Sequence, residues 1–238
     1  MTNTTRREIF RHAAIAAAAV SGLAGTDALG QTPSAKDEPE VTAAEDLMRE
    51  HGVIRRALLV YAHVTDALRT APGSVDVTAL RDTAQLFRAF GEDYHERMLE
   101  EQHIFPVVRR MKGEAARYPD ILVAQHARGR EITDYVLTLT GAGRLGAGDR
   151  EPLARALGRL VLMYEHHAAR EDTIVFPAWK TNFSNADLDR IGDQFEAIER
   201  KMFGRDGFED AVRKISGIEA VFGLSDISQF TPPPPPRR

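Results

Sequence analysis

The chain has 238 residues, of which 43% are hydrophobic and 28% are charged, and its formal net charge is −4. This length is enough for one well-buried domain, and the charge pattern contains no basic stripe of the kind that binds nucleic acid. The sequence contains no cysteine, which excludes disulfides, thiolate zinc sites and iron–sulfur clusters and leaves histidine and carboxylate as the strong metal ligands.

The N-terminus has the pattern of an export signal. Arg6 and Arg7 precede a weakly apolar run, Ala13–Ala24, that is too short and too rich in alanine for a stable membrane span. We therefore expect residues 1–30 to be a twin-arginine signal and the protein to be periplasmic or otherwise exported. The alternative is a basic tail without a targeting role. Residues 31–41 are polar and interrupted by proline, as in a linker.

Four long amphipathic helices follow. Thr42 with Glu45 three residues later is a capping box that opens the first helix, which should end near residue 71. The second is expected from about Asp76 to residue 111, and the third from about residue 120 to a glycine cluster that begins at Gly141. The fourth should run from about residue 149 to 180, with Pro152 in its first turn.

No alternating strand pattern appears between these helices, so the sequence predicts an all-α fold. Short turns between long helices favour an antiparallel up-down four-helix bundle over residues 42–182. Two shorter C-terminal helices are expected within residues 183–223. Residues 224–238 form a proline-rich tail, which we expect to be extended.

Each of the four bundle helices places one histidine on its inward face: His51, His95, His126 and His167. A single core histidine is usually explained by one satisfied hydrogen bond. Here, however, Glu171 lies one helical turn after His167, within the same apolar stripe. Burying a carboxylate costs several kcal/mol unless it is paired. A cation bound by imidazole and carboxylate would remove this cost, and iron, manganese and zinc all suit these ligands.

Several motifs resemble those of the hemerythrin-like (HHE cation-binding) domain, exported bacterial type. They are Glu50-His51, Tyr94-His95-Glu96, Glu100-Glu101 before Phe105-Pro106, Gln125-His126, and His167-Ala168-Ala169-Arg170-Glu171-Asp172 before Phe176-Pro177. The resemblance implies a four-helix bundle around a non-haem di-iron centre that binds O₂ or a related ligand such as NO. It also implies a ligand set: His51, His95, Glu100, His126, His167 and Glu171.

The second helix departs from this pattern. His95 and Glu100 are five residues apart instead of four, and a regular helix turns about 140° beyond a full circle over five residues. A single-turn π-bulge between them would restore the alignment. Glu96 and Glu101 are the alternative carboxylates. We favour Glu100 because it precedes Phe105 by the same five residues that separate Glu171 from Phe176.

A fifth histidine, usual in hemerythrins, has no clear counterpart. His166 points about 100° away from His167, whereas His103 follows Glu100 by three residues and is a candidate to approach the site. Water, an exogenous anion, Glu96 or Tyr94 are the other candidates for that position.

Three functions are compatible with this site. The first is a di-iron protein that binds O₂ or NO for sensing, storage or scavenging. The second is a di-iron oxidoreductase that acts on O₂, peroxide or NO, which a buried Tyr94 beside His95 would favour. The third is a zinc or manganese site that only stabilises the bundle. The sequence does not indicate an oligomeric state.

Overall fold

The computed structural model describes residues 41–236, which form helices and connecting turns without any β-strand. The predicted signal 1–30 and nearly all of the predicted linker lie outside the described residues. The prediction of an all-helical protein is confirmed over the part of the chain that the structure describes.

The first two long helices begin where their capping residues predict. Helix α2 (Ala43–Thr70) opens with the capping box, in which the Thr42 amide donates to Glu45 Oε2 at 2.8 Å and the Glu45 amide donates to Thr42 Oγ1 at 3.3 Å. The turn η1 (Pro72–Ser74) leads to α3 (Val77–Leu86), whose N-terminus is capped by Asp76. Helix α3 continues without a break into the π-helix η2 (Phe87–Ile104) and then α4 (Phe105–Val108).

The third and fourth long helices also follow the predicted boundaries. The short turn η3 (Ala115–Arg117) precedes α5 (Pro119–Thr140), which stops at Gly141. The turn η4 (Ala147–Asp149) precedes α6 (Arg150–Arg170). This helix continues through a second π-helical segment, η5 (Glu171–Val175), into α7 (Phe176–Lys180).

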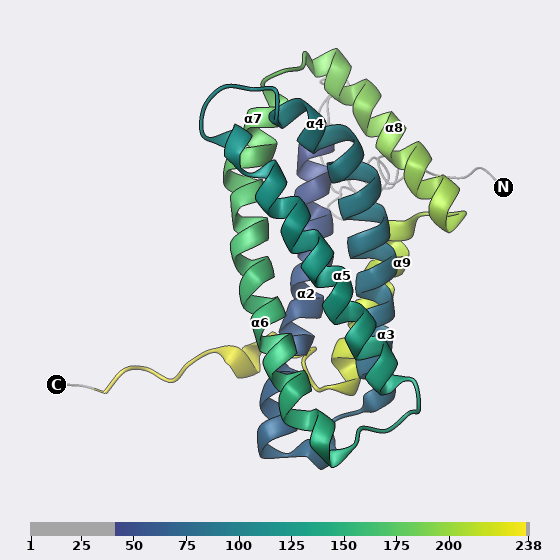
Figure 1. Ribbon diagram of the computed structural model, residues 1–238, viewed down its shortest axis with the longest axis vertical. Coiled ribbons are helices and arrows are strands. Elements are labelled where there is room, and N and C mark those ends of the chain that lie inside the picture. Colours follow the sequence, from purple (N-terminus) through teal and green to yellow (C-terminus); the bar gives the residue numbers. More distant parts are fainter. Residues whose placement is uncertain (1–40, 237–238) are drawn as a thin grey trace, which may run out of the picture.

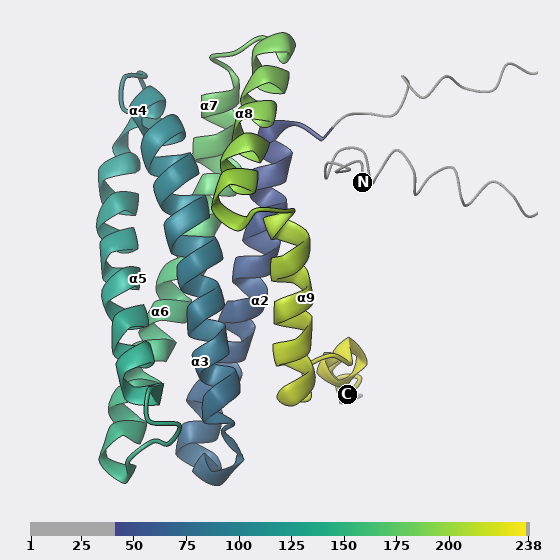
Figure 2. The ribbon, with the colours of Figure 1, turned by 90° about the vertical axis from the view of Figure 1, so that its right-hand side faces the viewer.

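These four helical segments lie side by side along the long axis of the molecule (Figures 1 and 2). Helix α2 packs along α6, and α5 packs against α3, η2 and α6. The space between them is filled by buried apolar side chains, among them Tyr61, Phe87 and Leu157.

Two further helices cover one side of this group (Figure 2). Helix α8 (Asn185–Phe203), capped by Ser184, packs against α2 and η2. It ends at Gly204, whose φ of 72° is a left-handed conformation that favours glycine. Helix α9 (Gly207–Val221) then packs against α2 and α3, and η6 (Ile227–Phe230) begins an exposed C-terminal tail.

Among residues 41–236, no helix combines the length and the apolar character that crossing a lipid bilayer would require.

Candidate metal centre

The six predicted ligands meet in the interior, between the four long helices. His51 lies on α2, His95 and Glu100 on η2, His126 on α5, His167 on α6 and Glu171 at the start of η5. Each of them is at most 3% exposed to solvent. Water therefore cannot solvate these carboxylates and imidazoles, which must be balanced by groups inside the protein.

The site consists of two histidine pairs that share two carboxylates. The ring centroids of His51 and His95 are 4.7 Å apart, and those of His126 and His167 are 4.8 Å apart. Glu100 faces both pairs, because Oε1 is 3.3 Å from His95 Nε2 while Oε2 is 3.4 Å from His126 Nε2.

Glu171 is placed in a similar way. Its Oε2 is 3.1 Å from His167 Nε2 and 3.4 Å from His51 Nε2. Each histidine pair therefore faces one oxygen of Glu100 and the Oε2 atom of Glu171. Carboxylates placed in this way can bridge two cations.

The π-helix η2 explains how His95 and Glu100 face the same point despite their five-residue spacing. A π-helix forms i→i+5 hydrogen bonds, so side chains five residues apart lie nearly above each other. The structure has this hydrogen bonding over the whole of Phe87–Ile104, a longer segment than the single turn that the sequence predicted.

A second π-helical segment, which was not predicted, follows Glu171. In both segments the amide of the phenylalanine before proline donates to the carbonyl oxygen of the glutamate five residues earlier, Phe105 to Glu100 and Phe176 to Glu171. The next residue in each case is proline, which has no amide hydrogen and whose ring clashes with a regular α-helical turn. The Phe-Pro pairs thus mark the positions where the helices widen.

The same two phenylalanines cover the site. Phe105 stacks on His126 with ring centroids 5.6 Å apart, and Phe176 stacks on His51 at 5.4 Å. Both are fully buried, so they exclude water from one face of these imidazoles.

Every histidine of the site is held from outside through its Nδ1 atom. The four Nδ1–acceptor distances lie between 2.7 and 2.9 Å: His51 to Asp172 Oδ1, His95 to Glu50 Oε2, His126 to Glu101 Oε1, and His167 to Gln125 Oε1. We call these four acceptors the outer ring.

The outer ring has a simple sequence rule: each acceptor is the chain neighbour of a predicted ligand and holds the histidine of another helix. Glu50 of α2 holds His95, and Glu101 of η2 holds His126. Gln125 of α5 holds His167, and Asp172 of η5 holds His51, which closes the ring. These roles were missed in the sequence, although all four residues lie inside the motifs quoted above.

The outer ring fixes the tautomer of the imidazoles. An acceptor at Nδ1 requires the hydrogen to be there, which leaves the Nε2 lone pair of a neutral ring directed inward. His126 Nε2 and His167 Nε2 are only 3.1 Å apart. Two lone pairs at this distance repel each other unless a proton or a metal ion lies between them.

Several polar atoms at the centre have no hydrogen-bond partner. They are His95 Nε2 and both carboxylate oxygens of Glu100 and of Glu171. Buried polar atoms are almost always paired, and five unpaired atoms around one point require an explanation. Metal ions held by the two pairs would give partners to His95 Nε2, both oxygens of Glu100 and Oε2 of Glu171, so the residues present fit a two-cation site.

In the absence of metal, protons on the imidazoles would balance the charge of the buried carboxylates. Burial lowers the pKa of His126, but the carboxylates of Glu96, Glu100 and Glu101 outweigh burial and raise that pKa to about 10. Burial raises the pKa of Glu171, but His167 and His51 outweigh it and hold that pKa well below its usual value. Metal binding should therefore release protons from the imidazoles.

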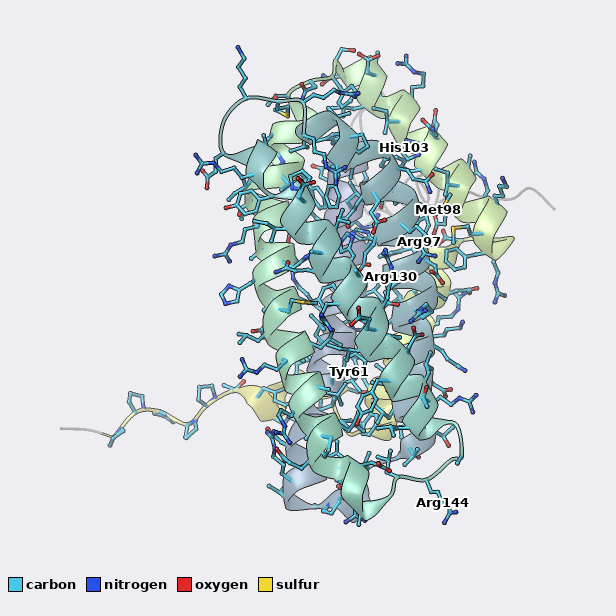
Figure 3. The ribbon with its side chains drawn as sticks, viewed as in Figure 1. Tyr61, Arg97, Met98, His103, Arg130 and Arg144 are labelled. Atoms are coloured by element: carbon cyan, nitrogen blue, oxygen red, sulfur yellow. The ribbon has the colours of Figure 1, made fainter. Side chains whose placement is uncertain are left out.

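The other candidates from the sequence lie outside the centre. Glu101 belongs to the outer ring, and Glu96 Oε2 is 3.9 Å from the outer nitrogen of His126. Arg130 bonds both of these carboxylates, at 3.2 Å to Glu96 and 2.6 Å to Glu101, so the guanidinium already neutralises this group. Figure 3 labels Arg130 between the helices.

Neither additional histidine reaches the centre. His103 lies on the side of η2 that faces α8 (Figure 3), where its ring packs against Phe195 at 5.5 Å. His166 is exposed and bonds Arg170, as its position on the helix predicted. Tyr94 donates to Glu50 Oε1 at 3.0 Å and therefore contacts the outer ring, not the centre.

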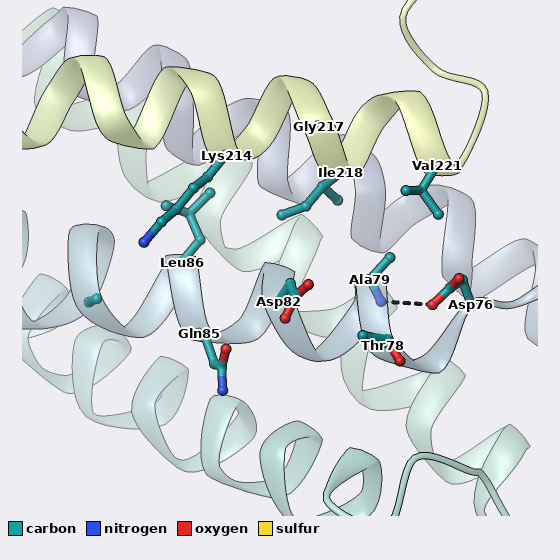
Figure 4. Close-up of a pocket in the computed structure, with 11 residues that line it drawn as sticks. Asp76, Thr78, Ala79, Asp82, Gln85, Leu86, Lys214, Gly217, Ile218 and Val221 are labelled. Atoms are coloured by element: carbon teal, nitrogen blue, oxygen red, sulfur yellow. Dashed lines mark hydrogen bonds between the residues drawn. The ribbon is translucent and has the colours of Figure 1, made fainter.

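A hollow of about 620 Å³ between α3 and α9 is a separate feature (Figure 4). Ile218 and Leu86 contribute to its lining, with Asp82 and Lys214 beside them. None of the six predicted ligands lines it, so we do not assign it to the metal centre.

Taken together, the helices enclose a buried histidine–carboxylate centre of the kind that binds cations. Comparison with known sequences agrees: residues 42–179 match the hemerythrin HHE cation binding domain. The chain belongs to this family, and it is a cation-binding protein of the class that usually holds iron.

Three mycobacterial relatives are each 40% identical over 220 residues, covering 92% of this chain and 85% of theirs. They are the uncharacterized proteins Rv1995 and MT2051 of Mycobacterium tuberculosis and Mb2018 of Mycobacterium bovis. No solved structure matches the chain.

Proposed function

We propose that this chain is a non-haem di-iron protein with the up-down four-helix bundle of hemerythrins, and that its centre binds O₂ or NO. The proposed ligands are His51 and His95 for one iron and His126 and His167 for the other, with Glu100 and Glu171 shared. The observation that carries the proposal is the set of unpaired carboxylate oxygens that face inward-directed Nε2 atoms.

The protein's own contribution follows from the described contacts. The outer ring holds the four imidazoles in one tautomer and one orientation. Phe105 and Phe176 keep water from the rings on which they stack. Bound iron would supply the site that takes up the diatomic ligand and the electrons that stabilise it.

A second candidate, a di-iron oxidoreductase acting on O₂, peroxide or NO, is favoured by the donor count. Each half of the centre offers two histidines and the shared carboxylates, a small donor set that would leave an iron held there room for further ligands. Such room would allow reactions beyond reversible binding.

Metal analysis joined to optical spectroscopy tests the proposal. Protein produced in iron-replete cells should contain two irons per chain and show a near-ultraviolet band that changes with air. Stoichiometric zinc or manganese with no oxygen-dependent band would refute it and would leave a metal that only stabilises the helices. Reversal of the band under vacuum would favour binding, whereas consumption of peroxide with turnover would favour the enzyme.

Export is a separate proposal and rests on the sequence alone. Arg6 and Arg7 before Ala13–Ala24 have the twin-arginine pattern, and such transport carries folded proteins with their metal already inserted. Fusing residues 1–41 to a reporter should send the reporter out of the cytoplasm, and Arg6→Lys with Arg7→Lys should prevent this. A reporter that stays inside with the native pair would refute it.

A further inference from the structure

Tyr164 is a buried tyrosine in direct contact with the centre. It lies on α6 one turn before His167, and the two ring centroids are 5.3 Å apart. Phe87 packs edge-on against its other side at 5.1 Å. The side chain is 2% exposed, so its surroundings are dry.

The hydroxyl of Tyr164 has a single well-placed acceptor. It donates to Glu96 Oε1 at 2.6 Å, while the other oxygen of Glu96 accepts from Arg130 at 3.2 Å. The backbone is shaped for this hydroxyl, because a Cβ atom on Gly129 would lie 2.2 Å from it. The chain therefore places a phenol between a proposed iron ligand and a buried carboxylate.

We propose that Tyr164 is a one-electron donor to the oxidised metal centre. In this step the phenol gives one electron toward the centre through its contact with His167, and its O–H bond breaks as the proton moves to Glu96 Oε1. The product is a neutral tyrosyl radical beside a protonated Glu96.

The overall reaction balances with hydrogen peroxide as the oxidant. One peroxide takes two electrons and two protons and becomes two waters. Tyr164 supplies one electron and a one-electron reductant such as ascorbate supplies the other, while both protons come from solvent because the phenol's own proton stays on Glu96. A second reductant molecule then gives its electron to the radical, and the proton on Glu96 returns to restore the phenol. This inference rests on the proposed di-iron function.

The neighbouring tyrosines are less suited to this role. Tyr94 donates to Glu50, but Glu50 also holds His95, so a proton transferred there would weaken the support of a ligand. The hydroxyl of Tyr61 has no hydrogen-bond partner and thus no acceptor for its proton. Glu96, in contrast, makes no hydrogen bond to a proposed ligand. Tyr94→Phe and Tyr61→Phe are therefore matched controls for Tyr164→Phe.

Rapid-freeze electron paramagnetic resonance tests the proposal. Iron-loaded full-length protein mixed with hydrogen peroxide should give an organic-radical signal that narrows when the tyrosine rings are deuterated. Tyr164→Phe should abolish it at unchanged iron content, whereas Tyr94→Phe and Tyr61→Phe should retain it. Glu96→Gln removes the proton acceptor and should slow radical formation by about 100-fold.

The outcomes separate this inference from the proposed function. If wild-type protein holds two irons and shows its oxygen-dependent band but gives no radical, or if the signal persists in Tyr164→Phe, the role of Tyr164 is refuted and the di-iron function stands. If the protein binds no iron, both fall. If Tyr164→Phe fails to load iron, Gly129→Ala provides a second test, because it displaces the hydroxyl and keeps the phenol. Gly129→Ala should reduce the radical signal. An undiminished signal would refute the role of Tyr164.

Discussion

Replacing Asp172 by alanine measures how much the outer ring contributes to metal binding. Asp172 Oδ1 is 2.7 Å from His51 Nδ1, and His51 is 2% exposed, so solvent has little access to replace the lost acceptor. Partners of this kind change metal affinity by about 10–100-fold, which corresponds to roughly 1.4–2.8 kcal/mol. Asp172→Asn keeps an acceptor oxygen but loses the charge, so we expect a loss of about tenfold.

The assay is a competitive titration of metal-free protein with ferrous iron against a chelator of known affinity. Asp93→Ala, which removes a partly exposed carboxylate bonded to Arg97, is the control and should not change the affinity. Asp172→Ala also removes the ion-pair partner of Arg55, and Arg55→Ala controls for the loss of this ion pair. Gln125→Glu gives His167 a charged partner and should strengthen binding. Equal affinities for wild type and Asp172→Ala would refute the role of the outer ring.

Three further outcomes are expected. His167→Ala and Glu171→Ala should each lower metal occupancy by about tenfold or more, whereas exposed His63→Ala should not, as metal analysis will show. Burial raises the pKa of Glu92 from 4.5 to about 7 despite its bond to Thr133, so the folded chain binds more protons than the unfolded chain between these values. Stability should therefore fall as pH rises from about 4.5 to 7, by roughly 3 kcal/mol, and Glu92→Gln should lack this loss in denaturant titrations at several pH values. Chelating the metal should lower the melting temperature of the protein. If the free metal concentration was 100-fold above Kd, the lost stability is about 2.7 kcal/mol. An unchanged melting temperature would contradict a site that stabilises the fold.

Most helix boundaries could be predicted because they depend on local chemistry. Thr42, Asp76 and Ser184 cap their helices through side-chain bonds to nearby amides, and Pro and Gly residues mark the turns. The inward placement of the four histidines followed from helical periodicity in the same way. The metal, its ligand set and the signal remain predictions.

The features that the sequence did not reveal depend on contacts between helices. The five-residue spacing of His95 and Glu100 pointed to a π-helical turn, but the length of η2 and the existence of η5 were not foreseen. Spacing within one helix also cannot show that Gln125 faces His167 of another. Once the six ligands are assumed, however, the hydrogen-bond acceptor that lies next to a ligand in each motif could have been used to predict the outer ring.

The closed outer ring has a consequence for how the chain tolerates insertions. Sliding any one long helix by a single residue would rotate its own ligand away and, at the same time, withdraw the acceptor that it offers to its neighbour. The axial register of all four helices is therefore defined jointly, before any cation arrives. Length changes in this protein should accumulate in the turns around Pro72 and Gly143, and not within the long helices.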